Sequence, residues 1–243
     1  MRIGVIGTTN DIGRGVVDRL LLLGHEVIAL DRRKTNAKTE FVQFDLRFLN
    51  QPIKTELDSV VLLSWIGSPR SSETMGTNVS AYKLLASEMK QKRVFPVFIS
   101  TLTANSLSRS VHSRAKYEAE ALFDGWGSIL RLGQVATNDG NVVGRSAKHS
   151  AVLAKLGRAF RTELLIPSVE LESVISHVCQ AATTRSIGVL ALVDEYRQAG
   201  GHSKAAPHIS SRALEYLVKT FALLAFKQRN DIIDRWHALA DSQ

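Results

Sequence analysis

RIGVIGTTNDIG, residues 2–13, says more about the architecture than any other part of this chain. The short apolar run that ends at Gly7 is typical of a buried parallel strand. A helical pattern covers residues 13–23, with apolar side chains on one face. A second apolar run covers residues 26–30 and is closed by Asp31. Strand, helix and strand in this order predict a βαβ unit.

The same alternation continues along the chain. Further strands are predicted at residues 41–44, 59–63, 96–99 and 128–132, and further helices at residues 77–91 and 112–123. This spacing predicts an α/β fold with a doubly wound parallel sheet over residues 1–137. The pattern then loosens, although a helix is predicted at 171–182 and a strand at 188–193. Residues 138–243 are therefore expected to form a small appended lobe, interleaved with the first domain rather than independent of it.

The composition excludes several classes of protein. Of 243 residues, 44% are hydrophobic and 22% are charged, so the chain can bury a core and is not expected to be disordered. The net charge is +8, but the basic residues are scattered, so no nucleic-acid site is predicted. A single cysteine, Cys179, excludes an internal disulfide and is expected in the core. Without a signal peptide or an apolar run of about 18 residues, the chain is expected to be soluble and cytoplasmic, with no integral membrane segment.

The turn after the first strand has the glycine spacing of a phosphate-binding loop. In a dinucleotide fold, the pyrophosphate lies here against backbone N–H groups and the positive end of the helix. Gly7 permits the tight turn and Gly13 lets helix and strand pack closely, while Asn10 takes a position that is usually glycine. Asparagine tolerates a left-handed conformation, although its side chain crowds the phosphate; a plain β–α turn is the alternative. The cofactor-binding residues predicted here are Gly7, Thr9, Asn10, Asp11, Ile12 and Gly13.

The residues after the second strand bear on the choice of cofactor. A carboxylate at Asp31 would accept hydrogen bonds from the adenosine ribose hydroxyls, which favours NAD. Arg32 and Arg33 follow directly, and Arg14 opens the first helix. Guanidinium groups would suit the 2′-phosphate of NADP, or would lie in solvent. NAD is therefore the predicted cofactor and NADP the alternative.

A series of motifs in this order resembles the extended short-chain dehydrogenase/reductase family, and within it the NAD-dependent epimerase/dehydratase branch. The motifs are VIGTTNDIGRGVVDRLLLLGHEVIALDR, FDL around Asp45, DSVVLLSW, TNVSAYKLLASEM, VFISTLTAN, HSRAKYEAEALF and ILRLGQV. LIPSVELESVISHVCQAA is similar to the later segment that borders the substrate in that family. The resemblance covers most of residues 1–193 and implies a Rossmann-like domain at 1–137 with a small C-terminal substrate lobe at 138–243.

The resemblance also implies roles for residues outside the turn. Asp45 and Leu46 would lie by the adenine, and Ser64 and Trp65 would line the nicotinamide side. Asn78 would be a supporting polar residue on the long helix. Asp31 and Arg32 would complete the cofactor-binding set at the ribose.

The family's catalytic pair, Tyr-x-x-x-Lys, is present only in part. His112 stands in place of the tyrosine, and Lys116 follows four residues later on the same helix face. Because imidazole titrates near neutral pH, His112 is either the base or a non-catalytic replacement. Lys116 would hold the cofactor ribose and tune charge. Thr101 would hold the substrate oxygen, with Ser100 and Thr103 as alternatives.

Other features lead to predictions about partners. In the resembled family, the helices matching 77–91 and 112–123 form a dimer interface, which implies a homodimer; the alternative is that the apolar faces of these helices belong to the core. Four basic residues would suit a substrate that carries a diphosphate, namely Arg131, Arg145, Lys148 and Arg158. The apolar stretch 214–226 is expected to pack on the body or a partner subunit rather than on a membrane. His202 and His208 have no further ligands at metal spacing, so no metal is predicted.

Two functions follow from these residues. The first is an NAD(P)-dependent, epimerase/dehydratase-like oxidoreductase that acts on a hydroxylated small molecule, with a nucleotide sugar as the favoured substrate. The second is a catalytically inactive NAD(P)-binding sensor or partner subunit, which the missing tyrosine and Asn10 favour.

Overall fold

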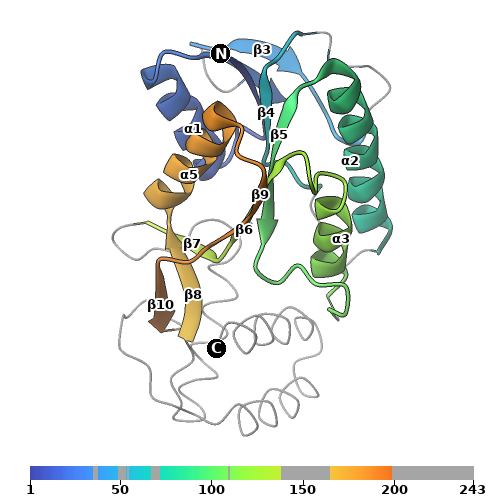
Figure 1. Cartoon of the computed structure of the whole chain (residues 1–243), viewed down its shortest axis with the longest axis vertical. Helices are drawn as coiled ribbons and strands as arrows, with labels where there is room; N and C mark the ends of the chain where they lie inside the picture. Colours follow the sequence, from blue (N-terminus) through green and yellow to red (C-terminus); the bar gives the residue numbers. More distant parts are fainter. Residues whose placement is uncertain are drawn as a thin grey trace, which may run out of the picture.

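The computed structural model describes residues 1–34, 38–48, 53, 55–66, 72–108, 110–137 and 165–198. Within them, seven parallel strands form one sheet in the order β3-β2-β1-β4-β5-β6-β9 (Figure 1). The strands are β1 (Arg2–Ile6), β2 (Glu26–Asp31), β3 (Glu40–Gln43), β4 (Ser59–Leu62), β5 (Phe95–Thr101), β6 (Ser128–Leu132) and β9 (Gly188–Leu192). This arrangement confirms the predicted Rossmann-like, doubly wound fold.

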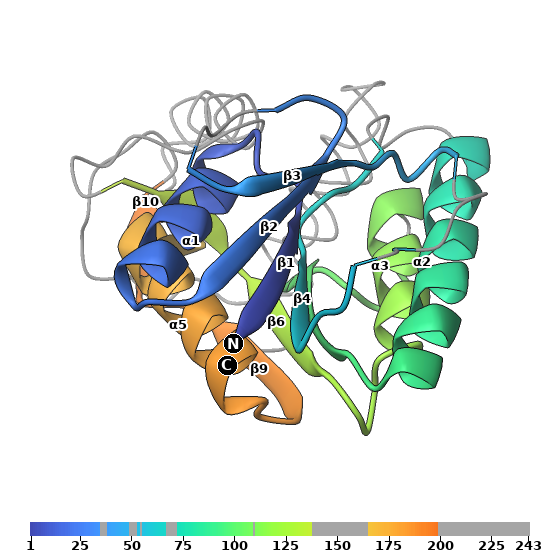
Figure 2. The same cartoon turned by 90° about the horizontal axis from the view of Figure 1, so that it is seen from above.

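Helices cover both faces of this sheet. Figure 2 shows α1 (Asp11–Leu22) beside α5 (Leu171–Thr184) on one face, and α2 (Ser72–Lys92) beside α3 (Val111–Glu120) on the other. Successive strand residues point to opposite faces, so each strand contributes to two cores. Val97 and Ile99 of β5 pack with the core under α1 and α5, whereas Phe98 between them packs with the core under α2.

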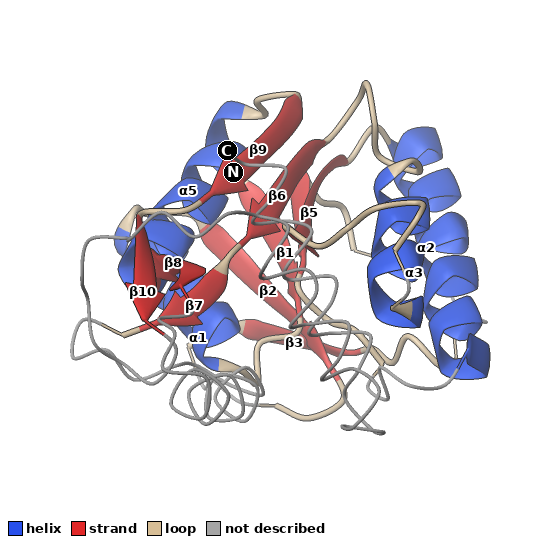
Figure 3. Ribbon diagram, turned by 90° about the horizontal axis from the view of Figure 1, so that it is seen from below, coloured by secondary structure: helices blue, strands red, loops and turns tan. Residues whose placement is uncertain are grey.

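A second, three-stranded sheet lies next to α1 and α5 (Figure 3). It consists of β7 (Gln134–Ala136), β8 (Leu165–Glu170) and β10 (Glu195–Gln198). β8 pairs parallel to β7 and antiparallel to β10. These strands are not predicted from the sequence, because they are short and gain their hydrogen bonds from partners far away in the chain. Gly133 allows the close approach, since a Cβ atom there would lie 2.6 Å from the carbonyl oxygen of Pro167.

The element bounds differ from the predictions mainly at α2. This helix begins at Ser72, five residues before the predicted start at 77, because its first turn, SETMG, lacks apolar periodicity. The helix predicted at 171–182 and the strand predicted at 188–193 are present as α5 and β9. Cys179 of α5 is buried in the core, as predicted. None of the helices within the described ranges is long and apolar enough to cross a membrane.

Several predictions lie outside the described residues. They concern the apolar stretch 214–226, His202 and His208, and three of the four basic residues, Arg145, Lys148 and Arg158.

Candidate functional site

The turn between β1 and α1 forms a cradle, residues 7–13, whose two ends, Gly7 and Gly13, have no room for a side chain. Gly7 has a φ of +101°, a conformation that L side chains rarely adopt. A Cβ atom on Gly7 would lie 2.9 Å from the backbone nitrogen of Ser64, and one on Gly13 would lie 2.1 Å from the carbonyl oxygen of Gly7. The turn, the start of α1 and the segment after β4 therefore meet at distances that exclude any side chain at these two positions.

Asn10 closes the turn in a way that the sequence analysis did not predict. Its φ of −95° and ψ of 170° are extended, so the expected left-handed conformation is wrong. Asparagine is tolerated at this position, which is usually glycine, because its side chain turns back toward the first turn of α1. Its Oδ1 atom accepts a 2.7 Å hydrogen bond from the N–H of Gly13 and caps α1. The cap takes up one of the free N–H groups of the first turn, which includes Asp11 and Ile12.

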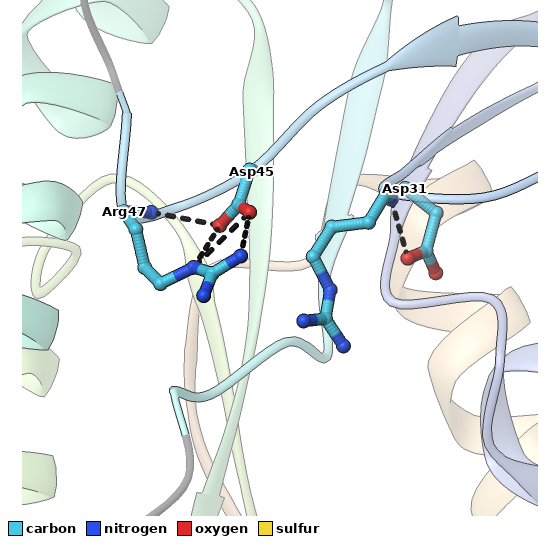
Figure 4. A network of polar contacts seen from close by, with 4 residues as sticks. Asp31, Asp45 and Arg47 are labelled. Carbon is cyan, nitrogen blue, oxygen red and sulfur yellow. Dashed lines mark hydrogen bonds and ion pairs between the residues drawn. The ribbon is translucent and has the colours of Figure 1, made fainter.

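Asp31 ties the end of β2 to this turn. Its carboxylate is buried and accepts hydrogen bonds from the Thr8 N–H at 2.8 Å, the Thr8 hydroxyl at 3.2 Å and the Arg32 N–H at 2.7 Å. Figure 4 shows the last of these contacts. A carboxylate offers about four lone-pair sites, so these three donors, all within the described residues, leave room for one more. Thr9 is exposed beside the turn, and Asp11 pairs with Arg14 on the first turn of α1.

A second carboxylate lies across from Asp31. Asp45, which follows β3, accepts hydrogen bonds from the Arg47 side chain, 2.5 Å at the shortest, and from the Arg47 N–H at 3.0 Å (Figure 4). These bonds hold the pKa of the Asp45 carboxyl below its usual value, and the positive charge of Arg32 acts in the same direction. Leu46 between the two is buried. The adenine-side residues predicted from the resemblance thus form an ion-paired loop beside β2.

The segment after β4 is pinned to α2 by buried polar groups. Asn78, which is fully buried, accepts the N–H of Ile66 at 2.7 Å and donates to its carbonyl oxygen at 3.1 Å. The hydroxyl of Tyr82 donates to the carbonyl oxygen of Ser64, and burial raises the pKa of that phenol. Asn78 and Tyr82 therefore hold the backbone on both sides of Trp65.

Trp65 covers Lys116. The Lys116 ammonium lies 4.0 Å from the centre of the Trp65 ring and 4.7 Å from that of Phe98, and it donates a 2.7 Å hydrogen bond to the carbonyl oxygen of Ile99. Only 8% of Lys116 is exposed, and this burial lowers its pKa to about 7. The negative charge of Glu120 acts in the other direction and raises that pKa, but by less. His112 lies edge-on to the indole, with ring centres 5.7 Å apart. The spacing thus places His112 and Lys116 on the same aromatic group.

Glu120 is shared between α3 and β6. Its carboxylate accepts hydrogen bonds from Arg131 Nε at 3.0 Å and from Arg131 Nη2 at 2.6 Å. Glu120 is only 4% exposed, and the pair raises the pKa of Arg131. Arg131 therefore lies in the central sheet and is paired with Glu120, while its contact with a diphosphate-bearing substrate stays a prediction.

The hydroxyl groups near the end of β5 form a chain. Thr101 Oγ1 lies 3.1 Å from Thr103 Oγ1, which accepts a 2.8 Å hydrogen bond from the hydroxyl of Ser113 on α3. Ser100, the neighbouring alternative, is buried on β5, and its hydroxyl finds no hydrogen-bond partner within the described part of the chain. The chain of hydroxyls thus includes Thr101 and Thr103 but not Ser100.

The predicted site residues all follow or flank the carboxyl ends of β1, β2, β3, β4 and β5, or lie on the helix that packs beside β5. In open α/β sheets this edge binds ligands. Four residues that contact this group were not predicted from the sequence, namely Tyr82, Phe98, Glu120 and Ser113. Of these, only Glu120 had a local signal, because it lies four residues after Lys116. Among the described residues, no group of three or more His, Cys, Asp or Glu side chains could hold a metal ion.

Comparison with known proteins agrees with this geometry. Residues 3–106 match the model of the NAD dependent epimerase/dehydratase family. No curated protein matches the sequence.

Solved structures extend the likeness to most of the chain. A UDP-galactose 4-epimerase is 19% identical with a TM-score of 0.65, over 82% of this chain and 80% of that one. The UDP-N-acetylglucosamine 4-epimerase from Bacillus cereus is 16% identical with a TM-score of 0.60, over 82% and 77%. MoeE5 in complex with UDP-glucose and NAD is 20% identical with a TM-score of 0.62, over 93% and 82%. At these identities the likeness shows the shared fold.

Proposed function

Since residues 3–106 match the model of the NAD dependent epimerase/dehydratase family, we propose that this chain is an NAD(P)-dependent oxidoreductase of that type, acting on a hydroxylated small molecule. The resemblance found in the sequence is confirmed by the family match and by the fold. The nucleotide sugar remains the favoured substrate, because UDP-sugars occur in the names of several structures that share this fold.

The observation that carries the proposal is the cradle at Gly7 and Gly13. Backbone atoms approach there so closely that a Cβ on either glycine would collide with them. Such a bare turn at the N-terminus of a helix suits a pyrophosphate, which binds to N–H groups and to the positive end of the helix dipole. Asn10 reduces the number of free N–H groups by capping Gly13 but leaves the cradle intact.

We propose NAD as the cofactor, with NADP as the alternative. The remaining lone pair of the Asp31 carboxylate would accept a ribose hydroxyl, and its negative charge would disfavour a 2′-phosphate. Exposed Arg32 would favour that phosphate. Leu46 and the Asp45 loop would lie by the adenine, and Ser64 and Trp65 by the nicotinamide. When bound, the cofactor supplies the hydride chemistry.

The proton chemistry falls to residues of this chain. We assign His112 as the base, Thr101 as the hydrogen-bond donor to the substrate oxygen, and Lys116 as the nearby cation. The contact of His112 and Lys116 with the same indole supports this grouping. Imidazole serves as a base near neutral pH without the help that a tyrosine needs from lysine.

We also propose a homodimer in the cytoplasm. α2 and α3 lie side by side on one face of the sheet (Figure 1), and Leu84 and Tyr117 are exposed on them. Exposed apolar side chains on paired helices suit an interface with a second copy. The oligomeric state in dilute solution, measured by light scattering, tests this part.

A second function is favoured by one observation. Lys116 is covered by Trp65 and its ammonium is already bound to the carbonyl oxygen of Ile99. A lysine held in this way, with histidine in place of tyrosine, would suit a protein that binds NAD(P) without catalysis, as a sensor or partner subunit.

Thermal unfolding with NAD, NADP and a panel of nucleotide sugars tests the proposal. A ligand at 100 times its Kd adds about 2.7 kcal/mol of stability. Stabilisation by neither dinucleotide would disprove both functions. Turnover that His112→Ala abolishes would support the enzyme. An inert protein that gains turnover through His112→Tyr would support the non-catalytic function.

A further inference from the structure

Three hydroxyl groups connect β5 to the helix that carries His112. The Ser113 hydroxyl donates to Thr103 Oγ1 at 2.8 Å, and Thr103 Oγ1 lies 3.1 Å from Thr101 Oγ1. The backbone N–H of Thr103 also donates to Thr101 Oγ1, at 3.4 Å. Ser113 is 2% exposed, so its hydroxyl does not exchange this bond for one to bulk water.

The number of protons limits how these three hydroxyls can be oriented. Three hydroxyls hold three protons and form two links. The Ser113 proton is used in the first link, and one threonine proton is used in the second. One proton therefore remains on the threonine pair and points out of the chain. Either threonine can be the donor in the second link, so the outward proton lies on Thr101 when Thr103 donates and on Thr103 when Thr101 donates.

We propose that the Thr103 hydroxyl is the donor in the second link, so that Thr103 and Ser113 are positioning residues that fix the Thr101 hydroxyl in one rotamer, as a hydrogen-bond donor toward a carbonyl oxygen of the substrate. This inference rests on the proposed function, in which Thr101 contacts the substrate. A chain of hydroxyls polarises its last member, so the terminal donor is stronger than an isolated threonine. The same direction prevents Thr101 from accepting a substrate proton, which leaves that role to His112.

Ser100 provides a matched control. It is the residue before Thr101 on β5, and it is buried, but its hydroxyl has no hydrogen-bond partner within the described residues. Ser100→Ala removes a hydroxyl from the same strand without removing any hydrogen bond among Thr101, Thr103 and Ser113.

The rotamer of Thr101 is the first test and needs no ligand. Three-bond couplings to the Thr101 methyl carbon, measured by NMR, report its χ1 angle. We expect a single rotamer in the wild type and in Ser100→Ala, and averaged couplings in Thr103→Val. Ser113→Ala should show partial averaging and covers the case in which Thr103→Val does not fold. A single Thr101 rotamer in both chain variants would overturn the proposal.

Binding of a carbonyl probe is the second test. The probe is a UDP-4-keto-6-deoxyhexose, titrated into the NAD-loaded protein by calorimetry, with UDP-glucose as the hydroxyl-bearing comparison. We expect Thr101→Val and Thr103→Val each to lower the affinity for the keto probe about three- to tenfold, which corresponds to one hydrogen bond. The double variant should bind the keto probe no more weakly than either single variant. Additive losses, or an equal loss in Ser100→Ala, would contradict the proposal. If NAD and both sugars fail to bind the wild type, the proposed function fails, while the NMR couplings still decide whether the chain orients Thr101.

Discussion

The ammonium nitrogen of Lys116 lies 4.0 Å from the centre of the Trp65 ring, so an indole covers the lysine that the resemblance assigns to the catalytic pair. A cation over an aromatic face is stabilised by the ring's quadrupole, but the same cover removes it from water. Burial dominates here and lowers the pKa of Lys116 to about 7. Trp65 is one of the side chains that bury Lys116 and is therefore expected to contribute to its lowered pKa.

Removing the Trp65 side chain should bring the pKa of Lys116 back toward that of an exposed lysine. In Trp65→Ala, water reaches Lys116, and its pKa should rise from about 7 toward 10.5. Side-chain NMR of the lysine Cε and Nζ atoms measures this titration. Trp65→Phe retains an aromatic face and should change the pKa less. An unchanged Lys116 titration in Trp65→Ala would show that Trp65 does not control it.

Lys116 should make stability depend on pH. Its pKa is about 7 in the folded state and 10.5 in the unfolded state, so between these values the unfolded chain binds the extra proton. Stability should therefore rise with pH across this window, by at most about 1.4 kcal/mol per pH unit, and the cost of burying the charge is fully present below pH 7.

Urea unfolding of the wild type and of Lys116→Met at several pH values checks this dependence. The stability of Lys116→Met relative to the wild type should fall as the pH rises from 7 to 10. Lys83→Met, which removes an exposed lysine of α2, should track the wild type. Parallel curves for the wild type and Lys116→Met would contradict the expectation.

Gly13→Ala should destroy the cradle. The added Cβ would lie 2.1 Å from the carbonyl oxygen of Gly7, which is backbone and cannot move aside, so we expect a loss of about 1–3 kcal/mol and of dinucleotide binding. Gly76→Ala is the matched control, because no atom lies within 4 Å of its Cβ position on α2. That change should stabilise the helix by about 0.5–1 kcal/mol. Thermal unfolding with and without NAD measures both effects. If NAD still stabilises Gly13→Ala, the cradle is not part of the cofactor site.

Asn10 should affect folding and binding in opposite directions. Asn10→Ala loses the cap on the Gly13 N–H and should cost about 1 kcal/mol, whereas Asn10→Gly should cost only about a few tenths. Both variants free that N–H, so NAD should bind at least as tightly as in the wild type. Chemical unfolding and calorimetric titration give the two quantities. Weaker NAD binding in Asn10→Gly would mean that the carboxamide itself contacts the cofactor.

The local sequence is enough to predict which edge of the sheet binds ligands. It is not enough to predict the side-chain contacts at that edge. Gly7, Gly13 and Asp31 are recognisable because a strand, a turn and a helix are consecutive in the chain, and each residue has one place in that unit. Asn10 was assigned to the correct turn but to the wrong conformation, because its cap depends on the actual path of the turn rather than on residue type.

The amino-acid sequence alone determined the alternation of strands and helices, and with it the parallel sheet, since apolar periodicity is a property of neighbouring residues. Only the tertiary structure decided that Trp65 covers Lys116, that Glu120 binds Arg131, and that Ser113 joins Thr103. These contacts join residues of different elements. Their energies depend on distance and burial, which no local pattern contains.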